Sequence, residues 1–188
     1  RFQSDYLNTP CFKGLHPSNP SIRQRGALDR EPESREMPGA FAPGAAFTPG
    51  DVDGGVINVV VEIPTGSAHK IEWNRELAAF QLDRVEPAIF AKPTNYGFIP
   101  QTLDEDGDEL DALIITDAPL TTGIFLEARV IGVLKFEDDG EIDDKIIVVP
   151  ADDRNTGNAI ATLEDLPKQL LAQIEHHFTH YKDLKKPG

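Results

Sequence analysis

Residues 104–111, Asp-Glu-Asp-Gly-Asp-Glu-Leu-Asp, carry the densest group of chemically active side chains in this sequence. Asp104, Asp106, Asp108 and Asp111 surround a single glycine and directly precede the apolar run 112–115. Carboxylates this close repel one another, and hard divalent cations such as Mg²⁺ compensate for that repulsion because they prefer oxygen ligands. The pattern therefore predicts a metal site held rigidly beside a buried strand.

Two other interpretations compete with a metal site. An acidic loop is often simply solvated. A calcium loop of the EF-hand type needs glycine at its sixth position and glutamate at its twelfth. Counted from Asp104, glycine is fourth and the twelfth residue is Ile115, so the EF-hand interpretation is excluded.

A second acidic cluster surrounds Gly140, between two expected strands. Its members are Glu137, Asp138, Asp139, Glu141, Asp143 and Asp144. Alone it would be a solvated hairpin tip. Together with residues 104–111, it predicts two acidic loops that meet at one end of a barrel and hold more than one cation. Glu62 supports this, because a carboxylate in an apolar strand needs a cation, a hydrogen-bond network or an outward orientation.

Basic residues lie at or near the expected strands and helix, at Lys70, Arg84, Lys145 and Lys182. Each alone is more often a surface charge than a ligand. A polyphosphate, however, is suited to a site where metal ions alternate with lysine and arginine. The metal ions bridge the phosphate oxygens, and the basic side chains offset the remaining negative charge. Tyr96 would donate a hydroxyl to such a site or serve only in packing.

Hydrophobic patterning predicts several short strands, at residues 56–63, 69–73, 79–82, 113–116, 124–134 and 145–149. Strands separated by turns without alternating helices favour a barrel over a parallel sheet. A helix is expected over 163–183, capped by Thr162 or Asp165, with Pro167 in its first turn. Adjacent His176 and His177 would point in different directions, so they are interpreted as core or surface residues rather than metal ligands.

Length and composition indicate one globular domain, at 188 residues with 27% charged and 39% apolar side chains. The net charge of −14 argues against nucleic acid as a partner. No apolar run approaches the roughly 20 residues of a membrane span. Cys11 is the single cysteine, which is consistent with a reducing, cytoplasmic location.

Residues 1–50 differ from the rest, with seven prolines, five glycines and no sustained periodicity. They are predicted to be an irregular segment, either an extension or a processed leader, with the folded domain at 51–188. The only methionine is Met37, which is consistent with either alternative.

Residues 106–111 resemble the signature of the soluble family I inorganic pyrophosphatases. Further blocks follow in that family's order, at 61–64, 70–72, 83–84, 95–99, 132–135, 138–145 and 180–184, so the resemblance covers about residues 56–186. It implies a distorted five-stranded OB-like β-barrel with packed helices, mainly β with α. It also implies Mg²⁺-dependent hydrolysis of pyrophosphate to two orthophosphates, with Mn²⁺ or Zn²⁺ as substitutes, and a homohexamer of bacterial type.

The resemblance also implies roles for individual residues. Asp108 matches the residue that accepts a proton from the attacking water. Metal ligands are matched by Asp106, Asp111, Asp143, Asp138 and Glu62, and phosphate contacts by Lys70, Arg84, Tyr181, Lys182, Lys145 and Tyr96, with Glu72 in the same cluster.

Two departures stand out: Lys92 precedes Pro93 where the family usually has tyrosine, and many relatives continue past the position of Gly188. The first is expected to alter phosphate contacts, and the second to weaken subunit packing.

Two rival functions follow from the same residues. A cation- or phosphate-binding module would keep the fold without turnover, although every charged position needed for catalysis is filled. A general nucleotide or phosphomonoester hydrolase is disfavoured, because no base-binding aromatic pocket or phosphate-cradling glycine loop is apparent.

Overall fold

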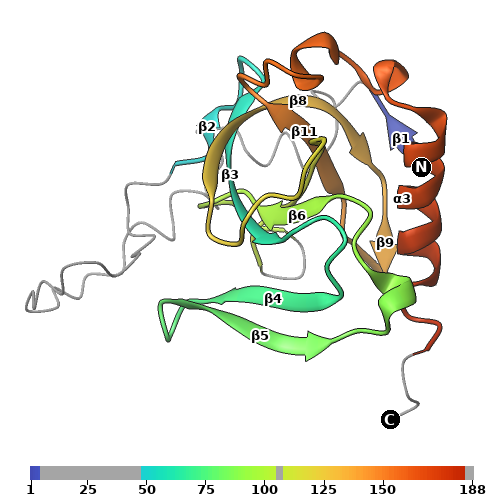
Figure 1. The fold of residues 1–188 in the computed structure, drawn as a ribbon. Helices are drawn as coiled ribbons and strands as arrows, with labels where there is room; N and C mark the ends of the chain where they lie inside the picture. The colour runs from blue at the N-terminus through green and yellow to red at the C-terminus, as the bar shows by residue number, and fades with distance from the viewer. Residues whose placement is uncertain (5–47, 105–107, 185–188) are drawn as a thin grey trace, which may run out of the picture.

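The structure is a computed structural model that describes residues 1–4, 48–104 and 108–184. Its centre is a closed barrel of five strands (Figure 1). In barrel order these are β3 (Val56–Ile63), β8 (Phe125–Leu134), β11 (Lys145–Pro150), β7 (Asp111–Ile114) and β6 (Asn95–Phe98). β3 pairs with both β8 and β6, which closes the barrel. The predicted barrel is confirmed.

Two apolar clusters explain why these strands read as almost continuous hydrophobic runs. Successive side chains of a strand point to opposite faces. In β11, Ile146 and Val148 point into the barrel, whereas Ile147 and Val149 point outward and pack beneath the helix. The strands beneath the helix are therefore buried on both faces, and the barrel and the helix stabilise each other.

The α-helix that covers this outer face is α3 (Lys168–His180), which lies along one side of the barrel (Figure 1). The expected helix over 163–183 begins five residues too early and ends three residues too late. Leu163–Asp165 is instead a separate 3-10 turn, η4, whose capping box joins Thr162 and Asp165. Because Pro167 lacks an amide hydrogen and has a fixed φ, it separates the two elements, and α3 begins after it.

Shorter elements surround the barrel. β4 (His69–Asn74) and β5 (Ala79–Val85) form a two-stranded hairpin that projects below the barrel in Figure 1 and leads into η2 (Ala88–Phe90). β9 (Glu137–Asp138) and β10 (Glu141–Ile142) form a small hairpin at the second acidic cluster. β2 (Gly50–Asp51) extends the sheet beside β3, and η3 (Gly157–Ala159) follows β11.

The first residues of the chain also join the sheet. β1 (Phe2–Gln3) pairs with the end of β8, and the Arg1 amine donates to the Lys135 carbonyl at 2.8 Å. Residues 5–47, which include Cys11 and Met37, lie outside the described part of the chain. Among the described residues, no helix has the length and hydrophobicity needed to span a membrane.

Several strand boundaries differ from those expected. β7 begins at Asp111, two residues before the predicted start, and ends at Ile114 rather than Thr116. β6 was not predicted as a strand, because Asn95-Tyr96-Gly97-Phe98 lacks the usual alternation of apolar and polar residues. Its place is set by tertiary contacts: the buried Asn95 side chain accepts from the amides of Thr65 and Leu120 and donates to Ile114.

Candidate active site

A cavity of about 490 Å³ opens where the barrel mouth, the β4–β5 hairpin and the end of α3 meet. The predicted site residues within the described part of the chain all line it. They are Glu62, Lys70, Glu72, Arg84, Tyr96, Asp108, Asp111, Asp138, Asp143, Lys145, Tyr181 and Lys182. The convergence of the two acidic loops is therefore confirmed. Asp106 lies outside the described residues.

The floor of the cavity is built by the parallel pairing of β7 with β11, which sets Lys145 beside Asp111 in register. The Lys145 ammonium contacts the Asp111 carboxylate at 2.5 Å and also contacts Asp143. Tyr96 donates its hydroxyl to the same Asp111 carboxylate. Burial alone would lower the pKa of Lys145, but the two aspartates hold it above its ordinary value. Lys145 is thus a fixed cation between two carboxylates.

Glu62 is nearly buried, with 8% of its surface exposed, on the barrel strand β3. The β3–β6 register shifts at this residue, and such irregularities re-aim side chains near active sites. The Trp73 amide donates to its carboxylate at 2.8 Å. Burial raises the pKa of Glu62 to about 8, helped by the charges of Asp111 and Glu72 and opposed by the Trp73 hydrogen bond. The charge of Lys70 offsets only part of this effect, so Glu62 keeps its proton at neutral pH.

One wall of the cavity joins β9 to the end of α3. Asp138 accepts a hydrogen bond from the Tyr181 hydroxyl at 2.8 Å and another from the Lys182 ammonium, which also contacts Asp139 at 2.7 Å. Burial alone would raise the pKa of Asp138, but the bonds from Lys182 and Tyr181 hold it below its ordinary value. Asp138 therefore stays ionised near neutral pH.

The opposite wall is the β4–β5 hairpin. Lys70 pairs with Glu72 at 2.5 Å, and Arg84 pairs with Asp83 at 2.5 Å and with Glu86. The strand register sets Lys70 opposite Arg84. These groups are partly exposed, and exposed ion pairs contribute little stability. Their partners can therefore be exchanged for an anionic ligand at small cost.

The donor set of the cavity fits hard divalent cations. Asp111, Asp143, Asp138 and Glu62 offer carboxylate oxygens, which Mg²⁺ and related ions prefer over nitrogen or sulfur. Within residues 1–4, 48–104 and 108–184, no three acidic, histidine or cysteine side chains already meet at one point, and the Lys145 ammonium lies between two of the aspartates. Glu62 is the nearly buried member of this donor set, and a bound cation would compensate for the desolvation of its charged form.

The similarity of this chain to known proteins shows its family. Residues 59–188 match the family model for inorganic pyrophosphatase. The chain belongs to the inorganic pyrophosphatase family. It is 81% identical over 142 residues to the inorganic pyrophosphatase of Neisseria meningitidis serogroup B, covering 76% of this chain and 80% of that protein. The Haemophilus influenzae inorganic pyrophosphatase is 77% identical over 142 residues, covering 76% of this chain and 81% of that protein.

Solved pyrophosphatase structures share the fold. The crystal structure of an inorganic pyrophosphatase from Neisseria gonorrhoeae matches with a TM-score of 0.74 and 78% identity, over 77% of this chain and 83% of that one. The Thermus thermophilus inorganic pyrophosphatase matches with a TM-score of 0.69 and 42% identity, over 73% and 78%. The protein is thus a hydrolase of pyrophosphate, and its family implies a divalent metal cofactor.

Sequence reasoning left several cavity residues unassigned. Arg75 and Glu86 line the hairpin wall, and Phe136, His177 and Phe178 line the side formed by the barrel and α3. Phe178 lies at helical spacing from Leu170 and Ile174, which indicates a buried face of the helix, but this spacing does not show that the face also borders the cavity. Arg75 and Glu86 have no sequence signal, because isolated charges beside turns resemble ordinary surface residues.

Proposed function

We propose that the protein hydrolyses pyrophosphate to two orthophosphates with Mg²⁺ as its working ion, and that Mn²⁺ or Zn²⁺ substitutes for it. One observation carries the proposal: two acidic loops distant in sequence line one cavity together with six lysine and arginine side chains. The donor chemistry is that of a hard cation, and the surrounding lysines and arginine suit a tetra-anionic substrate.

Asp106, Asp111 and Asp143 would hold the activating ions, with Asp138 and Glu62 holding ions that arrive with the substrate. When bound, such ions withdraw electron density from a coordinated water and from phosphoryl oxygens, which makes the water more acidic and the phosphorus more electrophilic. The support from this chain is that Asp111 and Asp143 share one ammonium and that the nearly buried Glu62 forms no ion pair with the described side chains.

Asp108 would accept a proton from the attacking water. It lies at the cavity edge on the loop that leads into β7, three residues before Asp111. A carboxylate in this position needs only to orient the water and take its proton, a modest general-base task.

The basic residues would bind the phosphate oxygens from both walls. Lys70 and Arg84, with Glu72 orienting Lys70, approach from the hairpin, whereas Tyr181 and Lys182 approach from the end of α3. Lys145 and Tyr96 would contact the substrate from the floor or fix Asp111 in place. Charge that develops on the leaving phosphate would be offset from two sides at once.

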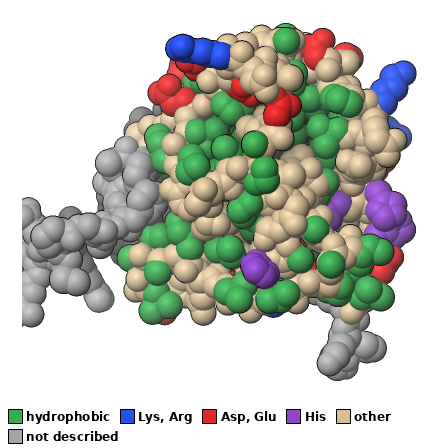
Figure 2. Space-filling model, in the orientation of Figure 1, with side chains coloured by type: hydrophobic (Ala, Val, Ile, Leu, Met, Phe, Trp, Pro, Cys, Tyr) green, Lys and Arg blue, Asp and Glu red, His purple; other side chains and the backbone are tan. Residues whose placement is uncertain are grey.

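We infer that the protein is a cytoplasmic homohexamer, with residues 51–188 as the catalytic domain and 1–50 as an N-terminal segment. The single cysteine of the sequence supports a reducing compartment. Exposed apolar side chains on the hairpin and η2, at Leu77, Leu82, Val85 and Ile89, support subunit contacts. Figure 2 shows hydrophobic side chains gathered along the lower edge of the molecule, where the hairpin lies. Light scattering on the full chain measures the subunit count.

A phosphate-release assay tests the proposed function. Pyrophosphate, ATP and a phosphomonoester are each incubated with and without Mg²⁺. Only pyrophosphate should be hydrolysed, and only with metal. Asp108→Asn should retain Mg²⁺ binding in calorimetry but lose at least about a hundredfold in turnover, since general-base catalysis contributes about 10²–10⁴-fold.

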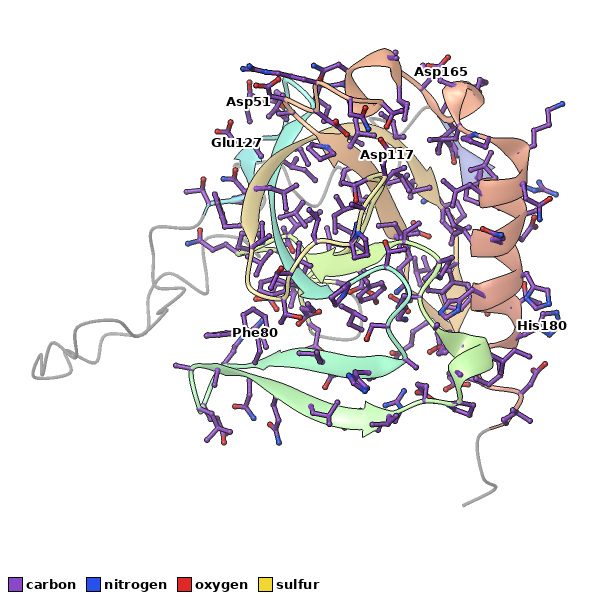
Figure 3. All side chains as sticks on the ribbon, viewed as in Figure 1. Asp51, Phe80, Asp117, Glu127, Asp165 and His180 are labelled. Atoms are coloured by element: carbon purple, nitrogen blue, oxygen red, sulfur yellow. The ribbon has the colours of Figure 1, made fainter. Side chains whose placement is uncertain are left out.

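Asp51→Asn is the matched control for that variant. Asp51 lies outside the cavity on β2, and its carboxylate accepts from the Gly54 amide, a role that asparagine keeps (Figure 3). Turnover should be unchanged. Normal rates in Asp108→Asn would remove the proposed base, and Mg²⁺ binding without any turnover by the wild type would favour the binding-module alternative.

A further inference from the structure

Lys92 is held firmly at the side of the cavity, on the segment between η2 and β6. Its carbonyl accepts from the Gly66 amide at 2.8 Å, and its own amide donates to the Ser67 carbonyl at 2.9 Å. The side chain lines the cavity, with the ammonium 4.4 Å from the centre of the Tyr96 ring and 5.6 Å from that of Phe178. Its backbone is therefore anchored while its charge faces the site.

The charge of Lys92 differs from every other lysine or arginine charge that lines the cavity. Each of the others contacts at least one carboxylate: Lys70, Arg75, Arg84, Lys145 and Lys182. Among the described side chains, none forms a hydrogen bond or an ion pair with the Lys92 ammonium, whose contacts are with aromatic faces. Lys92 is thus the lysine of the cavity whose ammonium directly contacts no carboxylate in the described part of the chain.

Removing a cation from water without a counter-ion is costly, and an aromatic face compensates for only part of that cost. Burial lowers the pKa of Lys92 to about 8, helped by the positive charges of Lys145 and Lys70 and opposed by Asp111 and Glu86. The amine therefore stays mainly protonated at neutral pH. His177, on the same side of the cavity, is neutral at neutral pH, because burial and the Lys92 cation lower its pKa to about 4, so it supplies no counter-charge.

We propose that Lys92 is a substrate-contacting residue, whose ammonium binds a phosphoryl oxygen of pyrophosphate, and of product phosphate, on the Tyr96–Phe178 side of the cavity. The inference rests on the pyrophosphatase activity and adds to it a cation that the family resemblance does not assign. An anion bound here gives the Lys92 ammonium the kind of ion-pair partner that the other lysines and arginines of the cavity already have. It also gives the substrate a further point of attachment, on the side of the cavity formed by Tyr96 and Phe178.

The test compares Lys92→Met, Lys92→Arg and the wild-type chain. Methionine keeps much of the apolar stem without the charge, and arginine keeps the charge. Binding of inorganic phosphate is measured by calorimetry with and without Mg²⁺, beside the KM for pyrophosphate. Because a hydrogen bond to a charged group contributes roughly 1.5–3 kcal/mol, Lys92→Met should weaken phosphate binding by about tenfold to a hundredfold. Lys92→Arg should stay within about threefold of wild type.

Lys168→Met is the matched control, because Lys168 is exposed at the start of α3 and does not line the cavity. It removes the same net charge and should leave phosphate binding unchanged. Thermal unfolding of each variant separates loss of a contact from loss of the fold, and Lys92→Gln repeats the test if the methionine variant does not fold.

Three results would overturn the assignment: wild-type phosphate affinity in Lys92→Met, equal losses in the arginine and methionine variants, or unfolding of both uncharged variants. The last would show that Lys92 serves the fold instead. None of these results resembles failure of the pyrophosphatase activity, which would appear as a wild-type protein without metal-dependent hydrolysis.

Discussion

Glu62→Gln in the metal-free protein tests how the buried Glu62 carboxyl group makes the free energy of unfolding depend on pH. Glu62 is nearly buried, and its pKa is raised from 4.5 to about 8, first by burial. The native state therefore keeps a proton that the unfolded chain releases above pH 4.5. Stability from this group is fully present below the unfolded pKa and is lost as pH rises toward 8.

The difference between the two pKa values sets an upper limit of about 5 kcal/mol on the free energy of unfolding that is lost as Glu62 ionises. A glutamine side chain does not titrate, so the variant lacks this pH dependence. The free energy of unfolding of wild type minus that of Glu62→Gln should fall by about 4 kcal/mol between pH 5 and pH 8. His177, whose pKa is lowered to about 4, gives an opposite slope below pH 6.5, but it is present in both proteins and cancels.

Urea unfolding in EDTA, at intervals from pH 4.5 to 8.5, measures the difference. A constant difference across this range would refute the reasoning, because it would mean that Glu62 is ionised in the native protein without a metal. Saturating Mg²⁺ supplies a second arm. Because Glu62 is a proposed ligand, the metal should favour the ionised carboxylate, and wild type should lose less stability toward pH 8.

Two further predictions concern the scaffold that positions the site. Asn95→Ala should lower the free energy of unfolding by about 3 kcal/mol in urea, because it removes a buried side chain and leaves the partly buried amides of Thr65 and Leu120 without their acceptor. Asn58→Ala, which loses one exposed hydrogen bond, should cost under about 1 kcal/mol. Gly97→Ala should lower the free energy of unfolding by about 3 kcal/mol or more in the same assay. The added Cβ would overlap the Val60 carbonyl where β6 pairs with β3. A change below about 1 kcal/mol would contradict that packing.

The barrel strands with strong hydrophobic patterns were predictable from local sequence alone. β3 has the bounds expected, and β8 and β11 differ by a residue at one end. Apolar β-branched runs bounded by turn residues specify a strand wherever the chain later places it. The acidic loops were also visible, because clustered carboxylates are a chemical signal that depends only on sequence spacing.

β6 and the start of α3 required the folded chain. β6 lacks a strand pattern and is held by the side chain of Asn95 and by its place between β3 and β7. The helix was expected too early because its apolar spacing continues through Leu163 and Leu166, although Pro167 divides the segment into two elements. In each case a tertiary contact or a backbone restriction outweighed the local pattern.

The sequence by itself therefore determined the kind of fold and predicted which side chains line the cavity. The pairing of those side chains was decided only in three dimensions. The parallel register of β7 and β11 sets Lys145 against Asp111 and Asp143, and the cavity leaves Lys92 facing aromatic rings among the described side chains. The physical reason is that charge interactions depend on distance and burial, which arise when separate strands close into a barrel.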